Sequence, residues 1–159
     1  MDEREEHRVI TFFDVMKFLH VTFAIIAVGF NASYGIWLAR AARQPEHQTH
    51  VLRGVTVLDR IANLGYALLL ATGLIMVATS PFELTTFWIA LALALYALAI
   101  VIGLVVYTPT LRKQIQTLGA EGPDSAEFVR LSNRGRIVGI LLAIDVLVIV
   151  FLMVTKPTL

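Results

Sequence analysis

The sequence contains no cysteine. That absence excludes disulfides, thiolate metal sites, iron–sulfur clusters and cysteine nucleophiles. Charged residues are also scarce, at 16% of the 159 residues, whereas 57% are hydrophobic. A soluble globular domain carries about 25% charged residues, so this composition is typical of a membrane protein. The formal net charge of +1 indicates no overall attraction to acidic partners.

Familiar catalytic and binding signatures are missing as well. The chain has no Gly-x-Ser-x-Gly and no His-Glu-x-x-His, and Gly119 to Gly122 lack the Gly-Lys-Ser/Thr of a phosphate loop. Basic and aromatic residues do not interleave, so we predict no nucleic-acid partner. His47 and His50 have the i,i+3 spacing of a metal pair on one helix face, but we favour a solvated loop there. We therefore predict no catalytic residue and no metal site.

The chain does contain four long apolar stretches. They are Val15–Leu38, Ile61–Thr79, Phe87–Tyr107 and Ile137–Thr155. Each has about the ~20 residues that an α-helix needs to cross a bilayer. Backbone groups in lipid must be satisfied internally, so these stretches should be helices. We expect an all-α fold: a single domain over residues 1–159 forming an antiparallel four-helix transmembrane bundle, packed up-down-up-down with crossings near about +20°.

Basic residues are divided unevenly between the two sides of this bundle. The predicted loops 39–60 and 111–136 carry four and five of the 13 Lys and Arg residues, so nine lie on one side. The connection SPFELTT carries none. By the positive-inside rule both basic loops are cytoplasmic and both termini lie outside. The chain opens with the acidic MDEREEHR and shows no cleavage site, so we expect the first helix to be retained rather than removed as a signal peptide.

Polar residues within the spans fall on single helix faces. The first span places His20 on a stripe with Ala24, Ala27, Asn31 and Tyr34. In the second span the corresponding stripe is Asp59, Asn63, Tyr66, Leu70 and Gly73. In the third span it is Tyr96, Gly103 and Tyr107, and in the fourth span it contains Asp145. Polar groups are costly in lipid, so we expect these faces to turn inward as an intramembrane polar cluster of His20, Tyr96, Asp145, Asn31 and Asn63. Small residues on the same faces would let the backbones approach closely.

Depth along the helices divides this cluster into two layers. A rise of ~1.5 Å per residue puts His20, Thr72, Tyr96 and Asp145 in an outer layer. Asn31, Tyr34, Asn63 and Tyr107 belong to a deeper layer near Asp59, Arg60 and Arg136. If the helices close in sequence order, the first and fourth are neighbours. We then expect His20 to bond Asp145 or Tyr96.

Three interpretations of His20 stay open. In the first, it hydrogen-bonds a neighbouring helix and fixes the helix register. In the second, it is an axial ligand of a b-type haem, and its second ligand is Met76, Met153, water or a group from another chain. In the third, His20 and Asp145 belong to a proton-linked transport path.

Three fragments of the chain resemble a known family. They are MKFLHVTFAIIAVGF in the first span, LTTFWIALALALY at the start of the third, and the closing FLMVTKP. They resemble the family called domain of unknown function 2269, a group of bacterial proteins described as predicted integral membrane proteins. The resemblance covers nearly the whole chain and extends to TPTLRKQI after the third span. It implies a bacterial integral membrane protein, and it implies no activity. With the positive-inside rule, we expect a bacterial inner-membrane protein with periplasmic termini.

A more distant likeness concerns the Leu-His pair of the first span. Leu19 and His20 are similar to a pair in CopD-type copper proteins and in HemJ-type four-helix protoporphyrinogen oxidases, where the first-helix histidine is associated with haem. Only His20 corresponds. No second histidine lies in a span, so an enzyme is the less favoured interpretation. We predict an accessory or structural subunit of a larger membrane complex or of a homo-oligomer. The third span supports this prediction, because its leucines and the evenly spaced Ala90, Ala94 and Ala97 can pack against another chain as well as against lipid.

Overall fold

The computed structural model describes residues 10–44 and 47–157. Within them the secondary structure is entirely helical: α1 (Phe12–Arg43), α2 (Gln48–Ala78), α3 (Phe87–Ile102), the π-helical turn η2 (Gly103–Tyr107), α4 (Thr108–Glu121) and α5 (Ala126–Thr155). Because η2 and α4 continue directly from α3, the three form one rod. The described residues thus make four helical rods and no strand, as the apolar stretches predict.

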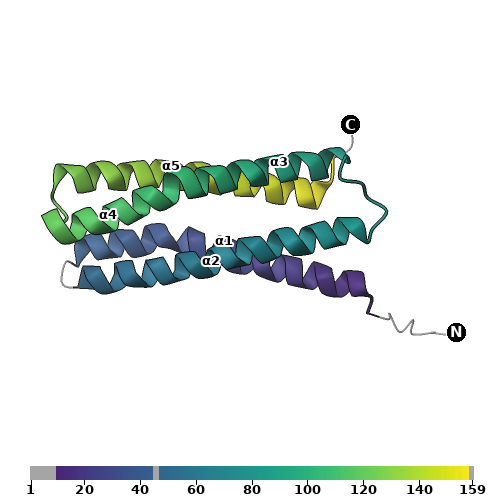
Figure 1. Cartoon of the computed structure of the whole chain (residues 1–159), viewed down its shortest axis with the longest axis horizontal. Coiled ribbons are helices and arrows are strands. Elements are labelled where there is room, and N and C mark those ends of the chain that lie inside the picture. The colour runs from purple at the N-terminus through teal and green to yellow at the C-terminus, as the bar shows by residue number, and fades with distance from the viewer. Residues whose placement is uncertain (1–9, 45–46, 158–159) are drawn as a thin grey trace, which may run out of the picture.

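The four rods run antiparallel as two hairpins (Figure 1). In the first hairpin α1 packs along α2; in the second α3 and α4 pack along α5, and α1 also touches α5. A hydrogen bond from Tyr96 on α3 to the carbonyl of Tyr66 joins the two hairpins through α2. The first and fourth rods are therefore neighbours, as expected. The predicted crossing angles stay a prediction.

The helices extend well beyond the apolar stretches at one end. The expected basic loops 39–60 and 111–136 are largely helical, because α1 continues to Arg43, α2 begins at Gln48, and α4 fills residues 108–121. The expectation of two long loops is wrong. Hydropathy marks where lipid ends, whereas the backbone stays helical until a cap or breaker stops it. We call this end, which carries nine of the 13 Lys and Arg residues, the arginine-rich end.

Local sequence signals account for several helix ends. The Thr11 hydroxyl accepts from the backbone N–H of Asp14, and the Asp14 carboxylate accepts from the backbone N–H of Thr11, which makes a capping box. The Ser125 hydroxyl accepts from the N–H of Phe128 and begins α5. Gly122 follows α4 with φ +84°, a left-handed conformation that favours glycine.

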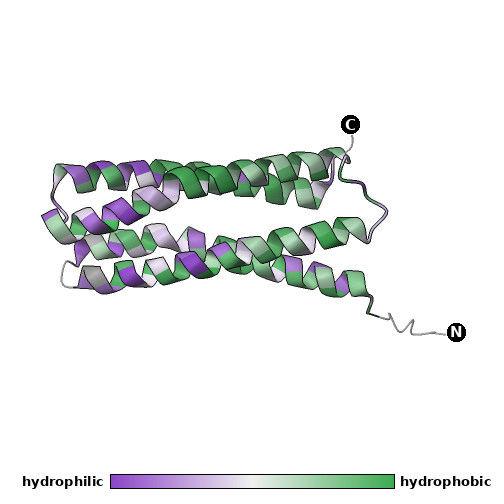
Figure 2. Cartoon of the chain, in the orientation of Figure 1, coloured by the Kyte–Doolittle hydropathy of each residue, from purple (hydrophilic) through white to green (hydrophobic). Residues whose placement is uncertain are grey.

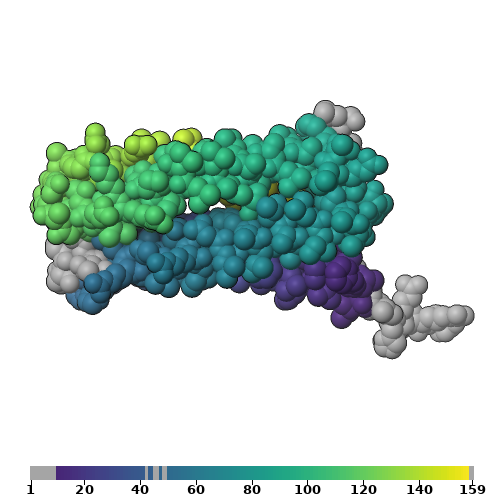
Figure 3. Space-filling model, viewed as in Figure 1, coloured from purple at the N-terminus to yellow at the C-terminus, as the bar shows by residue number. Residues whose placement is uncertain are grey.

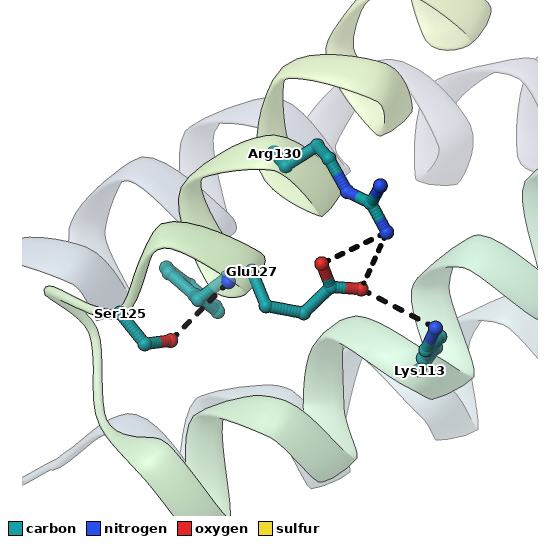
Figure 4. Close-up of polar contacts among 5 residues, drawn as sticks. Lys113, Ser125, Glu127 and Arg130 are labelled. Atoms are coloured by element: carbon teal, nitrogen blue, oxygen red, sulfur yellow. Dashed lines mark hydrogen bonds and ion pairs between the residues drawn. The ribbon is translucent and has the colours of Figure 1, made fainter.

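The arginine-rich end holds a packed core. Two clusters of buried side chains lie here: Tyr34, Val55 and Leu111, and then Leu52, Leu118 and Phe128. Hydrophilic residues gather on the outside of the same end, whereas the rest of the molecule is mostly apolar (Figure 2). Glu127 pairs with Lys113 at 3.3 Å and Arg130 at 2.8 Å, which ties α4 to α5 near their connection (Figure 4). This end is built like a small water-soluble helical bundle.

The four rods are also apolar over lengths that suit a lipid bilayer. Four rods are long and apolar enough to cross a membrane: Phe12–Ala41, His50–Ala78, Phe87–Glu121 and Ala126–Thr155. Their outward faces carry large apolar side chains, for example Phe18 at 68% exposure and Phe151 at 63%. In a bilayer such faces contact acyl chains and carry no hydrophobic penalty.

Candidate functional site in the membrane interior

His20 hydrogen-bonds the neighbouring helix α2. Its Nδ1 lies 3.0 Å from the carbonyl oxygen of Leu69 and 3.2 Å from the Thr72 hydroxyl. The expectation that Asp145 or Tyr96 is the partner of His20 is therefore wrong. The physical reason is that α1 and α2 pack along each other as a hairpin, so the polar atoms closest to the ring are those of α2.

The bonding pattern fixes the tautomer of the imidazole. A carbonyl oxygen only accepts, so Nδ1 must carry the proton that points to Leu69. The Thr72 hydroxyl donates to the carbonyl of Leu68 at 2.8 Å and is therefore free to accept from the same Nδ1. In the described part of the chain Nε2 has no hydrogen-bond partner, so it presents an unprotonated lone pair.

Gly73 makes room for this ring. A Cβ atom at this position would lie 2.9 Å from His20 Cε1 and 3.3 Å from Nδ1. About two turns deeper, a Cβ on Gly65 would lie 3.2 Å from that of Ala27, which is fully buried. The two glycines let α1 approach α2 closely, as small residues do in membrane helix pairs.

A second polar contact ties three helices together. Asn31 on α1 donates from Nδ2 to the Tyr66 hydroxyl at 2.6 Å, and Tyr96 on α3 donates to the carbonyl of Tyr66 at 2.7 Å. Tyr96 and Asn31 therefore both bond Tyr66, and Tyr96 does not bond His20, which corrects its predicted place in the outer layer. Counting residues from a helix end misplaces a tyrosine because its hydroxyl reaches several ångströms from its own Cα.

A third group surrounds Asp59. Asn63 donates to the Asp59 carboxylate at 3.1 Å, one helical turn away. The carboxylate also interacts electrostatically with Tyr34 on α1, Tyr107 in η2 and Arg112 on α4. The Asp59 side chain is partly buried.

Two buried polar atoms lack a partner among the described residues. They are the hydroxyl of Tyr34 and Oδ2 of Asp145. Tyr34 is 1% exposed and packs between Val55 and Leu111. Asp145 lies seven residues before Leu152, which is 5% exposed, so both occupy the inward face of α5. No hydrogen bond within residues 10–44 and 47–157 joins Asp145 to His20.

The comparison with protein families decides what kind of protein this is. A family model described as "Predicted integral membrane protein (DUF2269)" matches residues 14–157. The chain belongs to the DUF2269 family. The match includes every polar residue of the membrane interior described above, from His20 to Asp145. No curated protein and no solved structure matches the chain. This DUF2269 protein is an integral membrane protein, and a lipid bilayer is its environment.

Other features of the DUF2269 protein lie outside this polar interior. His50 lines a shallow groove on the α1–α2 hairpin together with Trp37 and Gly54, and the described residues contain no group of three His, Cys, Asp or Glu that could hold a metal ion. At the opposite end the Lys156 ammonium lies 5.5 Å from the ring centre of Phe82 and 5.7 Å from that of Trp88. Sequence reasoning missed this cation–π contact, because Phe82 and Trp88 lie far from Lys156 along the chain.

Proposed function

We propose that this DUF2269 protein is a non-enzymatic accessory or structural subunit of a bacterial inner-membrane complex or of a homo-oligomer. The observation that carries the proposal is that α2 supplies the hydrogen-bond partners of three polar side chains from the other helices, which are His20, Asn31 and Tyr96. Interhelical bonds of this kind contribute about 0.6–2 kcal/mol and fix helix register. Side chains used in this way stabilise a scaffold.

The third rod offers a surface for a partner. Four residues on one part of α3 are exposed: Ala90, Ala94, Ala97 and Leu98. Alanines allow a neighbouring helix to pack closely, so this exposed surface could be covered by another helix. Another membrane helix that presents small or apolar residues would pack here with its backbone close to α3. The occupant we favour is a helix of another subunit or of a second copy.

The native mass in lipid tests this proposal. The protein is extracted with its surrounding lipid in polymer-bounded discs, and its mass is compared with the protomer mass of 17.6 kDa. We expect a larger particle that dissociates in Ala94→Trp and persists in Leu147→Trp, since Leu147 is a lipid-facing residue of α5 with 66% exposure. A protomer-sized particle for the unmodified chain would refute the subunit role.

The orientation belongs to the same proposal. The arginine-rich end should be cytoplasmic and both termini periplasmic. Ser80→Cys should then react with an impermeant thiol reagent added to intact spheroplasts, and Ser125→Cys should react only after the membrane is opened. Because the natural chain has no cysteine, each variant reports a single site. Labelling of Ser125→Cys in intact spheroplasts would reverse the orientation.

A second candidate function rests on the His20 geometry. A histidine that ligates a metal commonly donates its other ring N–H to a carbonyl, which fixes the tautomer. His20 donates from Nδ1 to Leu69 and leaves Nε2 without a partner in the described residues, so this ring fits an axial ligand of a b-type haem. A bound haem would supply electron-transfer chemistry, and His20 would hold its iron.

Absorption spectroscopy separates the two candidates. Purified protein titrated with haem should develop a Soret band if His20 is a ligand. His20→Ala should abolish the band, Thr72→Val should shift it by loosening the ring, and Asn31→Ala should leave it unchanged because Asn31 bonds Tyr66 instead. If His20→Ala retains the band of the wild type, the haem role is wrong.

A further inference from the structure

A groove lies on the outward face of α1 near its C-terminal end. The described residues that line it are Gly35, Ile36, Ala39, Arg40 and Arg43. Helical periodicity places these residues on the side of α1 opposite Tyr34 and Ala41, which are both buried. The groove therefore opens away from the other helices. It encloses about 480 Å³, and sites that hold small molecules have volumes of about 300–1,000 Å³.

The two arginines of this groove have no partner in the described part of the chain. Both are exposed, and neither side chain makes an ion pair or a hydrogen bond within residues 10–44 and 47–157. A spacing of three residues places the Cβ atoms of Arg40 and Arg43 about 5–6 Å apart on one helix face, where like charges repel. Two guanidinium groups can both donate to a single phosphate, whose geometry matches theirs. The pair is therefore suited to a phosphate group.

The helix dipole gives no sufficient reason for these arginines. Basic residues in the last turn of a helix do complement its dipole. However, α4 ends at the same end of the molecule without a basic residue in its last turn. The arginine-rich end lies at the left of Figure 3, where the first hairpin (blue) packs against α4 and α5 (green).

The groove spans the change from apolar to basic residues along α1. The side chain of Ile36 is 72% exposed and that of Trp37 is 43% exposed, and Arg40 and Arg43 follow them. A tryptophan at the end of an apolar segment, with arginine just beyond it, is typical of helix positions level with lipid headgroups. A ligand in the groove would place an apolar part beside Ile36 and a charged part beside the arginines.

We propose that this groove binds an anionic phospholipid. The phosphate accepts hydrogen bonds from both guanidinium groups, and an acyl chain runs along Ile36 over the space beside Gly35 and Ala39. A free phosphate ion would leave the apolar part of the groove unused. A zwitterionic headgroup would bring its own cation beside two unpaired arginines, so an anionic headgroup is preferred.

Tryptophan fluorescence tests the site, because one of the two tryptophans lies beside it. Trp37 is about one turn from Arg40, and Trp88→Phe leaves it as the single reporter. This parent protein is reconstituted into vesicles with the same lipids in both leaflets, so the result does not depend on orientation. Phosphatidylglycerol and phosphatidylcholine, brominated near the start of their acyl chains, are compared, since bromine quenches a tryptophan that it approaches.

We expect phosphatidylglycerol to replace phosphatidylcholine beside Trp37 with a preference on the order of tenfold. The double substitution Arg40→Gln and Arg43→Gln should remove this preference. The matched control is Arg53→Gln with Arg60→Gln, which removes the same charge from exposed positions of α2 and should keep most of it.

The control lies at the same end of the bundle. The antiparallel register that brings Gly65 beside Ala27 places Arg53 opposite Ala39. If the control loses as much preference as the groove variant, general surface charge attracts the lipid and the site is refuted. Equal quenching by the two lipids in the parent protein would also refute it.

Ala39→Phe separates the groove from its charges. The larger side chain fills space between Gly35 and the two arginines without changing the net charge. The preference for phosphatidylglycerol should fall severalfold, because the lipid can no longer lie against α1. A variant that retains the full preference would show that the arginines act as surface charges and that the groove holds no lipid.

Discussion

The two ends of the bundle are held together by different forces. At the arginine-rich end, Leu111, Leu118 and Phe128 are buried in clusters and charged residues cover the outside. At the end that carries the chain termini, few large side chains are buried, and the helix contacts depend on Gly73, His20 and the stacking of Lys156 on Phe82. One polypeptide therefore uses two modes of packing along the same four rods.

The difference follows from the solvent on each side. Water drives apolar side chains together, so a conventional core is favoured where charged residues cover the outside of the bundle. Lipid provides no such force between helices, and membrane contacts depend on close backbone approach and on interhelical hydrogen bonds. Substitutions should therefore cost most at the arginine-rich core and less within the membrane.

The largest effect is expected for Leu111→Ala. Leu111 is 5% exposed and packs with Tyr34 and Val55, so truncation leaves a cavity in the core. The free energy of unfolding should fall by about 2–5 kcal/mol. Titration with SDS in mixed micelles measures it. Leu147→Ala, on the lipid face, is the control and should change it by less than about 0.5 kcal/mol. Equal losses for the two variants would contradict the contrast between core and lipid face.

A smaller effect is expected for Gly73→Ala. The added methyl would lie 2.9 Å from His20 Cε1, so the ring must move and lose its contacts with Leu69 and Thr72. Overpacking of this kind costs about 1–3 kcal/mol. Unfolding in the same micelles measures it, and nitrogen NMR of the imidazole reports the ring. A Cβ added at Gly29 would meet no other atom within 4 Å, so the control Gly29→Ala should leave the free energy of unfolding unchanged or raise it. An unperturbed His20 resonance in Gly73→Ala would refute the contact.

Tyr96→Phe should have a more modest effect. The substitution keeps the ring and removes the hydroxyl that donates to the carbonyl of Tyr66, a hydrogen bond that joins the two hairpins. A bond of this type contributes about 0.6–1.7 kcal/mol in membrane proteins. The same SDS titration should detect the loss. A variant as stable as the wild type would mean that α3 is positioned by packing alone.

The smallest effect is expected for Glu127→Gln. The carboxylate pairs with Lys113 and Arg130 on the outside of the arginine-rich end, where water and salt screen the attraction. The thermal midpoint should fall slightly at low ionic strength, and the difference should vanish at high salt. Glu121→Gln, an exposed residue at the end of α4, is the control and should show no salt-dependent difference. A loss that persists at high salt would contradict a screened surface pair.

The fold was largely predictable because its signals are local. Four apolar stretches of membrane length, the cap at Ser125 and the small residues opposite His20 can all be recognised without knowing any neighbour. The lengths of the helices were not predictable from hydropathy. Residues 108–121 are polar enough to look like a loop, but η2 carries the third rod straight into α4.

The polar interior was predicted as a set of residues and not as a set of pairs. The predicted stripes include Asn31, Tyr66 and Gly73, which helical periodicity places along single helix faces. They do not say that His20 bonds Thr72, since a partner depends on the rotation and axial shift of two packed helices within about an ångström.

The sequence alone therefore determined that this membrane protein has four helices long and apolar enough to cross a bilayer, because hydropathy and backbone hydrogen bonding act segment by segment. Only the tertiary structure decided which helix His20 bonds, where the packed core lies, and that Tyr34 and Asp145 carry buried polar atoms without a protein partner in the described chain. Those features arise from contacts between segments far apart in sequence, and such contacts exist only once the hairpins have packed.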